Sequence, residues 1–230
     1  MAMVHWWPLI DNTKDQITLI NLTNKGATQT ATGKFGKAYS FSGTSGVCLQ
    51  HAFAQEINNT QFSFAFWIKL NSSWSGWGQV LTIGTVGTSW TDIRAGIDID
   101  ANKIPYFSIS DGTNATSYNG PHNTALTAGV WYHIACSVDN KVMKMYVNGV
   151  PATSAFGYTP SFNPNFSNAT VISIGGNGSE VGECDMTDVR IYDHALSQAE
   201  AKELSKAKII HYTFNDTMAE NTTNLLPLSL

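Results

Sequence analysis

The sequence is poor in charge. Only 13% of its 230 residues are Asp, Glu, Lys or Arg, whereas 43% are hydrophobic, and the formal net charge is -4. The 13 Lys and Arg residues are scattered along the chain rather than gathered in a stripe. A nucleic-acid-binding surface needs clustered positive charge. The distribution therefore predicts that nucleic acid is not a partner.

Long apolar runs and an export signal are also lacking. No apolar run approaches the roughly 20 residues that a membrane-spanning helix needs, so we expect no membrane insertion. The opening residues, MAMVHWWPLI, contain neither the basic region nor the cleavage site of a secretory signal. We therefore expect no signal peptide.

Cysteine is scarce. Cys48, Cys136 and Cys184 are odd in number, far apart and without a Cys-x-x-Cys pair. This pattern predicts neither a disulfide framework nor a cysteine-based zinc site, and we expect three buried thiols. The six histidines show no metal-ligand spacing, and no Gly-x-Ser-x-Gly nucleophile motif occurs.

Alternating apolar and polar residues between turns rich in Asn, Thr, Ser and Gly are abundant, and they are typical of β-structure. The clearest stretch is 131–150, WYHIACSVDNKVMKMYVNGV, in which two apolar arms flank Asn140 and the second arm ends in Asn148-Gly149. Both places carry the residues that tight turns need. We predict a β-hairpin followed by a short third strand. The side chains expected to share its buried face are Tyr132, Ile134, Cys136, Val138, Met143, Met145 and Val147.

Further strands are expected along the chain. The stretch QFSFAFWIKL at 61–70 alternates strictly, so its Phe and Ile side chains face one way and a central strand is predicted. Strict alternation in 186–192 likewise predicts Met186, Asp188 and Arg190 on one face. The other expected strands lie at 5–9, 18–22, within 33–43, and at 80–83, 93–99, 104–110 and 170–175.

Loops and one helix complete the predicted elements. Loops are expected at 71–78, 113–128 and 156–167. Ser197 and Glu200 have the spacing of a capping box, which predicts a short helix over 198–206.

Three motifs together resemble the LamG-like module family, within the concanavalin A-like lectin and glucanase group. They are the GKFGKAxxFxG pattern at 33–43, the hairpin at 131–150 and the closing DVRIYDHALSQAEAKEL at 188–204. The resemblance covers roughly residues 4 to 208. It implies an all-β fold, a two-sheet antiparallel jelly-roll sandwich with one short C-terminal helix. We expect one such domain over residues 1–208.

The C-terminal segment, residues 209–230, is too short for a second sandwich. Its stretch IIHYTFND at 209–216 loosely repeats VHWWPLID at 4–11. The segment is therefore either an edge strand or the start of a truncated following region, and we favour the second interpretation.

Aromatic and polar side chains in the predicted loops form a candidate ligand surface. Aromatic rings stack on the C–H faces of sugars, while polar side chains bind hydroxyl groups. The candidates are Trp74, Trp77, Trp90, Asp92, Tyr118 and His122. The alternative for the loop tryptophans is that they pack against the edge of the sandwich. The four tryptophans expected in the core are Trp6, Trp7, Trp67 and Trp131.

Carboxylates suited to catalysis are few. Hydrolysis of a glycosidic bond needs two carboxyl groups that flank it, and laminarinase-like relatives carry Glu-x-Asp-x-x-Glu on one strand, which is absent here. Glu180, Glu183 and Asp185 cluster in a Gly-rich connection in a different order, and Asp98 and Asp100 are expected to be turn carboxylates. We therefore expect no enzymatic activity, with glycoside hydrolysis as an alternative.

The resemblance also implies a structural calcium ion as a candidate cofactor, held by hard oxygen ligands near the last strand. Asp188, with Asp11, is the candidate ligand pair. Relatives have DDVRIY where this chain has Thr187-Asp188, so one carboxylate is missing. The alternative is that Asp188 pairs with Arg190 or is solvated.

Both ends of the chain resemble structural proteins of tailed bacteriophages and prophages. The motifs are VHWWPL at 4–9, HYTFND at 211–216 and ENTTNLLP at 220–227. They imply a non-catalytic adhesion module on the virion surface, on the tail or capsid, that binds cell-surface or mucosal glycans. Other virion proteins or the module's own larger chain are the implied partners. The alternative is a virion assembly or decoration module without glycan binding.

Overall fold

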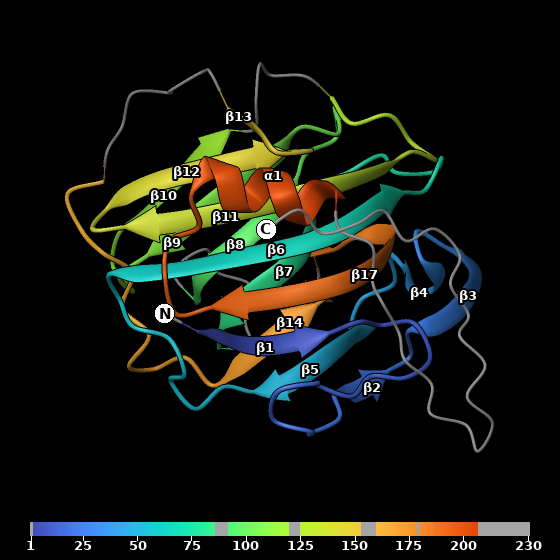
Figure 1. Ribbon diagram of the computed structural model, residues 1–230, viewed down its shortest axis with the longest axis horizontal. Coiled ribbons are helices and arrows are strands. Elements are labelled where there is room, and N and C mark those ends of the chain that lie inside the picture. Colours follow the sequence, from blue (N-terminus) through green and yellow to red (C-terminus); the bar gives the residue numbers. More distant parts are fainter. Residues whose placement is uncertain (1, 86–91, 120–124, 153–159, 179, 207–230) are drawn as a thin grey trace, which may run out of the picture.

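The computed structural model describes residues 2–85, 92–119, 125–152, 160–178 and 180–206. It contains two antiparallel sheets that pack against each other and one helix on the outside (Figure 1). The eight-stranded sheet consists of β1 (Met3–Trp7), β3 (Thr28–Gly33), β4 (Gly36–Ser42), β6 (Gln61–Leu70), β11 (Trp131–Asp139), β12 (Val142–Val147), β13 (Val150–Pro151) and β17 (Glu183–Tyr192). The seven-stranded sheet consists of β2 (Thr23–Lys25), β5 (Cys48–Ala52), β7 (Gly78–Gly84), β8 (Ile93–Ile99), β9 (Pro105–Ser110), β10 (Ala115–Asn119) and β14 (Val171–Ile174).

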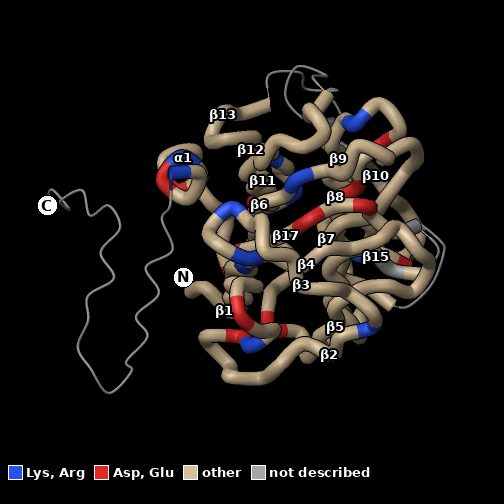
Figure 2. The backbone as a smooth tube through the Cα atoms, turned by 90° about the vertical axis from the view of Figure 1, so that its right-hand side faces the viewer, with Lys and Arg blue, Asp and Glu red and all other residues tan. Residues whose placement is uncertain are grey.

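A small ribbon, β15 (Gly176–Asn177) with β16 (Glu180–Val181), and the helix α1 (Gln198–Lys206) complete the structure. The predicted all-β jelly-roll sandwich with one short C-terminal helix is confirmed. No helix among the described residues has the length and apolarity needed to cross a membrane. Lys and Arg lie scattered over the described backbone rather than along one face (Figure 2). The segment 209–230 lies outside the described residues.

The strand order places β6 and β17 at the centre of the eight-stranded sheet, which runs β13-β12-β11-β6-β17-β4-β3. One edge of β17 is shared, because β4 pairs with its first half and β1 with its second. The seven-stranded sheet runs β10-β9-β8-β7-β14-β5-β2.

The predicted hairpin is confirmed as β11 and β12, which pair from Ile134 opposite Val147 to Asp139 opposite Val142. Both turn residues after β11 have positive φ, 46° at Asn140 and 76° at Lys141. Two consecutive residues of this kind give a turn whose twist matches that of the strands. The turn into β13 is of the same kind, because Asn148 and Gly149 also have positive φ, 52° and 74°.

The core lies between the sheets and is dominated by aromatic rings of β6. Phe62, Phe64 and Phe66 are fully buried, as the alternation predicted. The Phe62 and Phe64 rings contact Phe107, and Phe62 also contacts Phe166. At about 2 kcal/mol per ring, their burial is a large part of the gross hydrophobic stabilisation. All three cysteines are buried free thiols, as expected.

Two of the four tryptophans expected in the core are buried, but only Trp7 lies among the core side chains between the sheets, because Trp67 alternates with Phe66 and Ile68 and faces away from them. Trp7 is 0% and Trp67 5% exposed, whereas Trp6 and Trp131 are half-buried. Each of the half-buried rings lies under a basic side chain at cation–π distance. These two rings therefore cover the sheet from outside rather than fill the space between the sheets.

The helix packs on the outer face of the eight-stranded sheet (Figure 1). Ala65 and Ala135 are paired on β6 and β11, and their small side chains leave room for Ala201 of the helix. The capping box is confirmed, because Ser197 Oγ accepts the Glu200 amide at 3.3 Å and Glu200 Oε2 accepts the Ser197 amide at 2.8 Å.

The strict alternation predicted for 186–192 is wrong. Both Met186 and Val189 face the core, because a β-bulge between Thr187 and Arg190 inserts one extra residue. Asp188, inside this bulge, has φ of 54°. The bulge lies where β4 gives way to β1 along the edge of β17.

The predicted strand at 18–22 is also wrong, because the chain turns there and β2 begins only at Thr23. The strands β3, β5 and β10 were not predicted, and β10 lies within the expected loop 113–128. β2, β3 and β10 lie at or near sheet edges and carry polar residues on both faces, so they lack the apolar alternation that marks a strand.

Candidate functional site

A row of polar side chains crosses the outer face of the seven-stranded sheet. Asp98 alternates with core residues of β8, and Tyr106 alternates with the core residue Phe107 on β9. The register places Tyr106 beside Asp98, and Asp98 beside Gln79 of β7. Side chains directly opposite each other on antiparallel strands share a face. Tyr106, Asp98 and Gln79 therefore line one row that faces away from the core.

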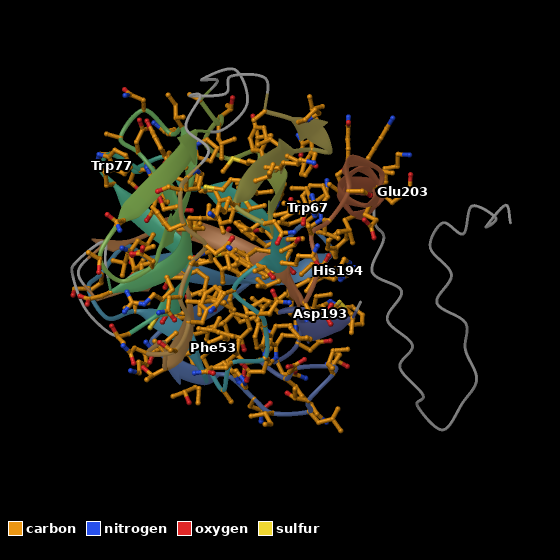
Figure 3. The ribbon with its side chains drawn as sticks, turned by 90° about the vertical axis from the view of Figure 1, so that its left-hand side faces the viewer. Phe53, Trp67, Trp77, Asp193, His194 and Glu203 are labelled. Carbon is orange, nitrogen blue, oxygen red and sulfur yellow. The ribbon has the colours of Figure 1, made fainter. Side chains whose placement is uncertain are left out.

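An exposed aromatic ring lies at the end of this row. The Trp77 side chain is 48% exposed, and its ring centroid lies 5.0 Å from that of Tyr106, with the planes tilted by 44°. Figure 3 shows Trp77 at the rim of the molecule, on the side away from the helix that carries Glu203. We call these two rings the Trp77–Tyr106 pair. They offer a ligand an apolar surface, whereas Asp98 and Gln79 beside them are only 1% and 3% exposed.

Trp74, in the same loop, is packed inside. It is only 5% exposed, and its Nε1 donates to the main-chain oxygen of Asp100 at 2.9 Å. A Cβ added at Gly78 would lie 2.7 Å from the Trp74 ring, so this glycine makes room for it. The place of Trp74 in the predicted ligand surface is therefore corrected: its ring has no exposed face and instead anchors the loop that presents Trp77.

The other predicted ligand residues are only partly described. Asp92 is half-buried before β8, and its main-chain oxygen accepts the Thr85 amide at 2.9 Å. Tyr118 lies in β10 opposite Phe107, and its side chain is outside the described part. Trp90 and His122 lie outside the described residues. Tyr106 was not predicted, although the alternation of Tyr106 with Phe107 carried the signal.

Three of the acids considered for catalysis have structural partners. Glu183 accepts a hydrogen bond from the Ser73 hydroxyl, and Asp185 forms an ion pair with Lys69 at 2.7 Å. Asp100 Oδ1 accepts the Ile104 amide at 2.7 Å, which makes it a turn carboxylate as predicted. The same expectation is wrong for Asp98, which lies within β8 and is 1% exposed.

The two predicted calcium ligands both hold basic side chains. Asp188 is 2% exposed, and its Oδ1 accepts from Arg190 Nε and from Trp6 Nε1, both at 2.8 Å. Burial raises the pKa of Asp188, and the attraction of Arg190 offsets this only in part. Asp11 is exposed, and the Lys37 ammonium lies 3.3 Å from it. The alternative that Asp188 pairs with Arg190 is confirmed, and calcium binding stays a prediction.

Histidine spacing predicted no metal site, yet the fold gathers three potential ligands. Among the described residues, one atom each of His5, His51 and Glu56 lie within 4.8 Å of one another. Glu56 Oε1 is 3.9 Å from His5 Nε2 and 3.8 Å from His51 Nε2. The histidines lie far apart in the sequence and on strands of different sheets. Their approach is therefore invisible to any search for local spacing.

Comparisons with known proteins agree with this architecture. A family model described as the concanavalin A-like lectin/glucanases superfamily, Laminin_G_3, matches residues 41–202. A search of curated proteins found no significant match.

Several solved structures share the fold. Domain 4 of AbnA, a GH43 extracellular arabinanase from Geobacillus stearothermophilus in complex with arabinotriose, is 19% identical with a TM-score of 0.66, and the match covers 88% of this chain and 98% of that domain. Trypanosoma rangeli sialidase, in complex with the inhibitor DANA, is 16% identical with a TM-score of 0.65 over 89% of this chain and 33% of that one. The binding domain of Paraclostridial Mosquitocidal Protein 1 is 17% identical with a TM-score of 0.64 over 88% of this chain and 51% of that one. These identities show a common fold alone.

Proposed function

Because the chain belongs to the concanavalin A-like lectin/glucanase superfamily, we propose that it is a non-catalytic carbohydrate-binding module. The proposed binding site is the Trp77–Tyr106 pair. The observation that carries the proposal is the Trp77 ring, 48% exposed yet in contact with Tyr106. Two adjacent aromatic rings, one of them exposed, form a flat apolar platform on which a sugar ring can stack.

The pair suits a sugar for two physical reasons. The indole and phenol faces can bury the C–H face of a pyranose or furanose ring. The loop that carries Trp77 is also held in place, because Trp74 is buried and donates a hydrogen bond to the main-chain oxygen of Asp100. A ring held in place before binding loses little conformational entropy when the ligand arrives.

A glycan ligand is also supported by the arabinanase domain. Domain 4 of that enzyme forms a complex with arabinotriose, and the shared fold spans 98% of that domain. A module of this size and topology is therefore large enough to bind a small saccharide.

Binding without catalysis is supported by the state of the acids. Glu183 and Asp185 are engaged with Ser73 and Lys69, and Asp100 caps a turn. The alternative, a glycoside hydrolase, would release reducing ends from a β-glucan, and Glu183→Gln would abolish that release. We expect no release above the blank.

We further propose that the module is displayed on a phage virion, on the tail or capsid, where other virion proteins or its own larger chain hold it in several copies. The motifs at the two ends of the sequence motivate this context. Multivalent display would raise the avidity for cell-surface or mucosal glycans about 10²- to 10⁴-fold over a single contact. The exposed Trp77 also favours one alternative, a structural virion module in which this ring is a protein interface.

A glycan array tests the proposed function. We expect the wild-type protein to bind at least one glycan, and Trp77→Ala to bind it about ten-fold more weakly or worse, which corresponds to about 1.4 kcal/mol. Val142→Ala is the matched control, because Val142 is 47% exposed on β12 of the other sheet. Binding that survives in a Trp77→Ala, Tyr106→Ala double variant, or no binding by the wild type, would remove the proposal. A stable oligomer that shields Trp77 from a fluorescence quencher would favour the structural alternative.

A further inference from the structure

The cluster of His5, His51 and Glu56 joins the two sheets at one place. His5 lies on β1 of the eight-stranded sheet, His51 lies on β5 of the seven-stranded sheet, and Glu56 follows β5. The imidazole rings meet edge to face, with centroids 4.7 Å apart. Figure 1 shows β1 and β5 as neighbours at the end of the sandwich far from β13. In the seven-stranded sheet, β8, β7 and β14 separate β9, which carries Tyr106, from β5, which carries His51.

His5 is held in one orientation and one tautomer. Its Nδ1 lies 2.6 Å from Asp15 Oδ2, and its ring stacks on Trp7 with centroids 4.8 Å apart. Asp15 is itself fixed, because it also accepts the Trp6 and Ile17 amides and the Thr18 hydroxyl. A carboxylate only accepts, so Nδ1 carries the proton and Nε2 presents its lone pair. A carboxylate behind the far nitrogen is the usual support of a metal-binding histidine.

The lone pair of His5 Nε2 has no hydrogen-bond partner, although His5 is 1% exposed. A buried acceptor without a partner is costly, which indicates that something binds there. Glu56 Oε1 faces it at 3.9 Å and faces His51 Nε2 at 3.8 Å. Both distances are too long for a hydrogen bond. The three atoms thus surround a gap rather than bond to one another.

We propose that His5, His51 and Glu56 bind one divalent transition-metal ion of the Zn²⁺ type, which links the two sheets. Two imidazoles and one carboxylate suit zinc, whereas calcium prefers oxygen ligands alone. Zinc bonds of about 2.0 to 2.2 Å in a tetrahedron place the ligand atoms about 3.4 Å apart. The observed separations from Glu56 Oε1 exceed this by a few tenths of an ångström. A small shift of the Glu56 side chain closes that difference, and a movement of the His51 ring brings the two imidazole nitrogens, which lie within 4.8 Å of each other, to the same spacing.

Glu56 is the ligand that can move most, and it is also the one that solvent reaches. Its two carboxylate oxygens accept the Ala54 amide at 3.0 Å each, so the side chain is already turned towards the histidines. It is 24% exposed, so an ion can reach the site from solvent, and a water molecule can fill the fourth coordination position. Asp15 acts as a positioning residue for His5.

Metal titration of the chelator-treated protein tests the proposal. We expect one Zn²⁺ per chain by calorimetry, and Co²⁺ should give the intense visible absorption of a four-coordinate site. Zinc at about 100 times its Kd should raise the Tm by about 5 to 10 °C. Glu56→Gln should weaken Zn²⁺ binding by about 100-fold or more, because losing a metal ligand exceeds the 10- to 100-fold effect of losing a supporting residue. Glu56→Gln keeps the shape of a partly exposed side chain, so this variant should fold.

His194→Gln is the matched control, because His194 Nε2 also lies 3.8 Å from a glutamate oxygen, that of Glu200, without a second histidine. It should leave zinc affinity unchanged. Failure of the wild type to bind one Zn²⁺, or an affinity that Glu56→Gln and His51→Gln both leave unchanged, would overturn the proposal. So would equal weakening by His194→Gln. None of these results bears on glycan binding at Trp77, so the two proposals fail separately.

Discussion

Asp188 shows how much a single buried charge depends on its partner. The carboxylate is 2% exposed and is satisfied by Arg190 and Trp6. Arg190→Met would leave the charge buried without its counter-ion, so we expect a loss of about 3 to 5 kcal/mol in the free energy of unfolding. Urea unfolding at neutral pH measures this.

The double variant Arg190→Met, Asp188→Asn is the control for that prediction. It removes the uncompensated charge, and Asn tolerates the positive φ of 54° at this position. We expect it to regain a large part of the lost stability. An Arg190→Met protein that is as stable as the wild type would show that the pair contributes little.

Residue chemistry alone could not separate Trp74 from Trp77. Both lie in the same Ser- and Gly-rich loop, yet one is 5% and the other 48% exposed. What decides between them is the room left by Gly78 and Gly182, where a Cβ would lie 2.7 Å and 3.3 Å from the Trp74 ring. Gly182 is distant in sequence, so the loop itself carries no sign of this contact. Tyr106 could have been found, because its alternation with Phe107 was in the sequence.

At the scale of elements, the helix is the part that the sequence predicts best. Its start depends on Ser197 and Glu200, which are local, and both capping hydrogen bonds form. Ser197→Ala removes the acceptor for the Glu200 amide, so we expect a loss of about 1 kcal/mol in the free energy of unfolding. Thermal or urea unfolding measures it. Ser205→Ala, near the other end of the helix, is the control and should cost less; equal losses would contradict a specific role for the cap.

Strand β17 shows where element prediction fails. The strict alternation of 186–192 is broken by the bulge at Asp188. The bulge is fixed from outside the strand, because the main-chain oxygen of Pro8 accepts both the Asp188 amide and the Thr187 hydroxyl. The Pro8–Thr187 contact joins residues that are 179 positions apart in the sequence. Local periodicity therefore predicted that the strand exists but not which side chains face the core.

At the scale of the whole molecule, the sandwich was predictable because the hairpin at 131–150 and the strand at 61–70 each require a partner layer for their apolar faces. The contact between His5 and His51 was not predictable, because it results from how the two sheets stack. Sites built between layers need the tertiary structure, whereas sites on one strand can be found from alternation.

The pH dependence of the free energy of unfolding is a property of the whole molecule, and we expect His133 to be a major cause of the loss of stability in acid. His133 is 1% exposed, and burial, with a smaller effect of Arg190, lowers its pKa to about 3. In the unfolded chain a histidine has a pKa of about 6.5. Between these values the unfolded state binds a proton that the folded state does not. The stability from neutral His133 is therefore complete above about pH 6.5 and is lost as the pH falls towards 3.

We expect this loss to reach about 2 kcal/mol at pH 5, because one pKa unit corresponds to about 1.4 kcal/mol. Urea unfolding at pH 7.5 and pH 5, with a chelator present, measures it. His133→Gln cannot take up a proton, so its stability should fall less between the two pH values. His51, whose pKa burial and His5 also lower, titrates in the same direction and remains in both proteins. The difference between them therefore isolates His133, and identical losses in both would show that its imidazole is protonated within the folded protein.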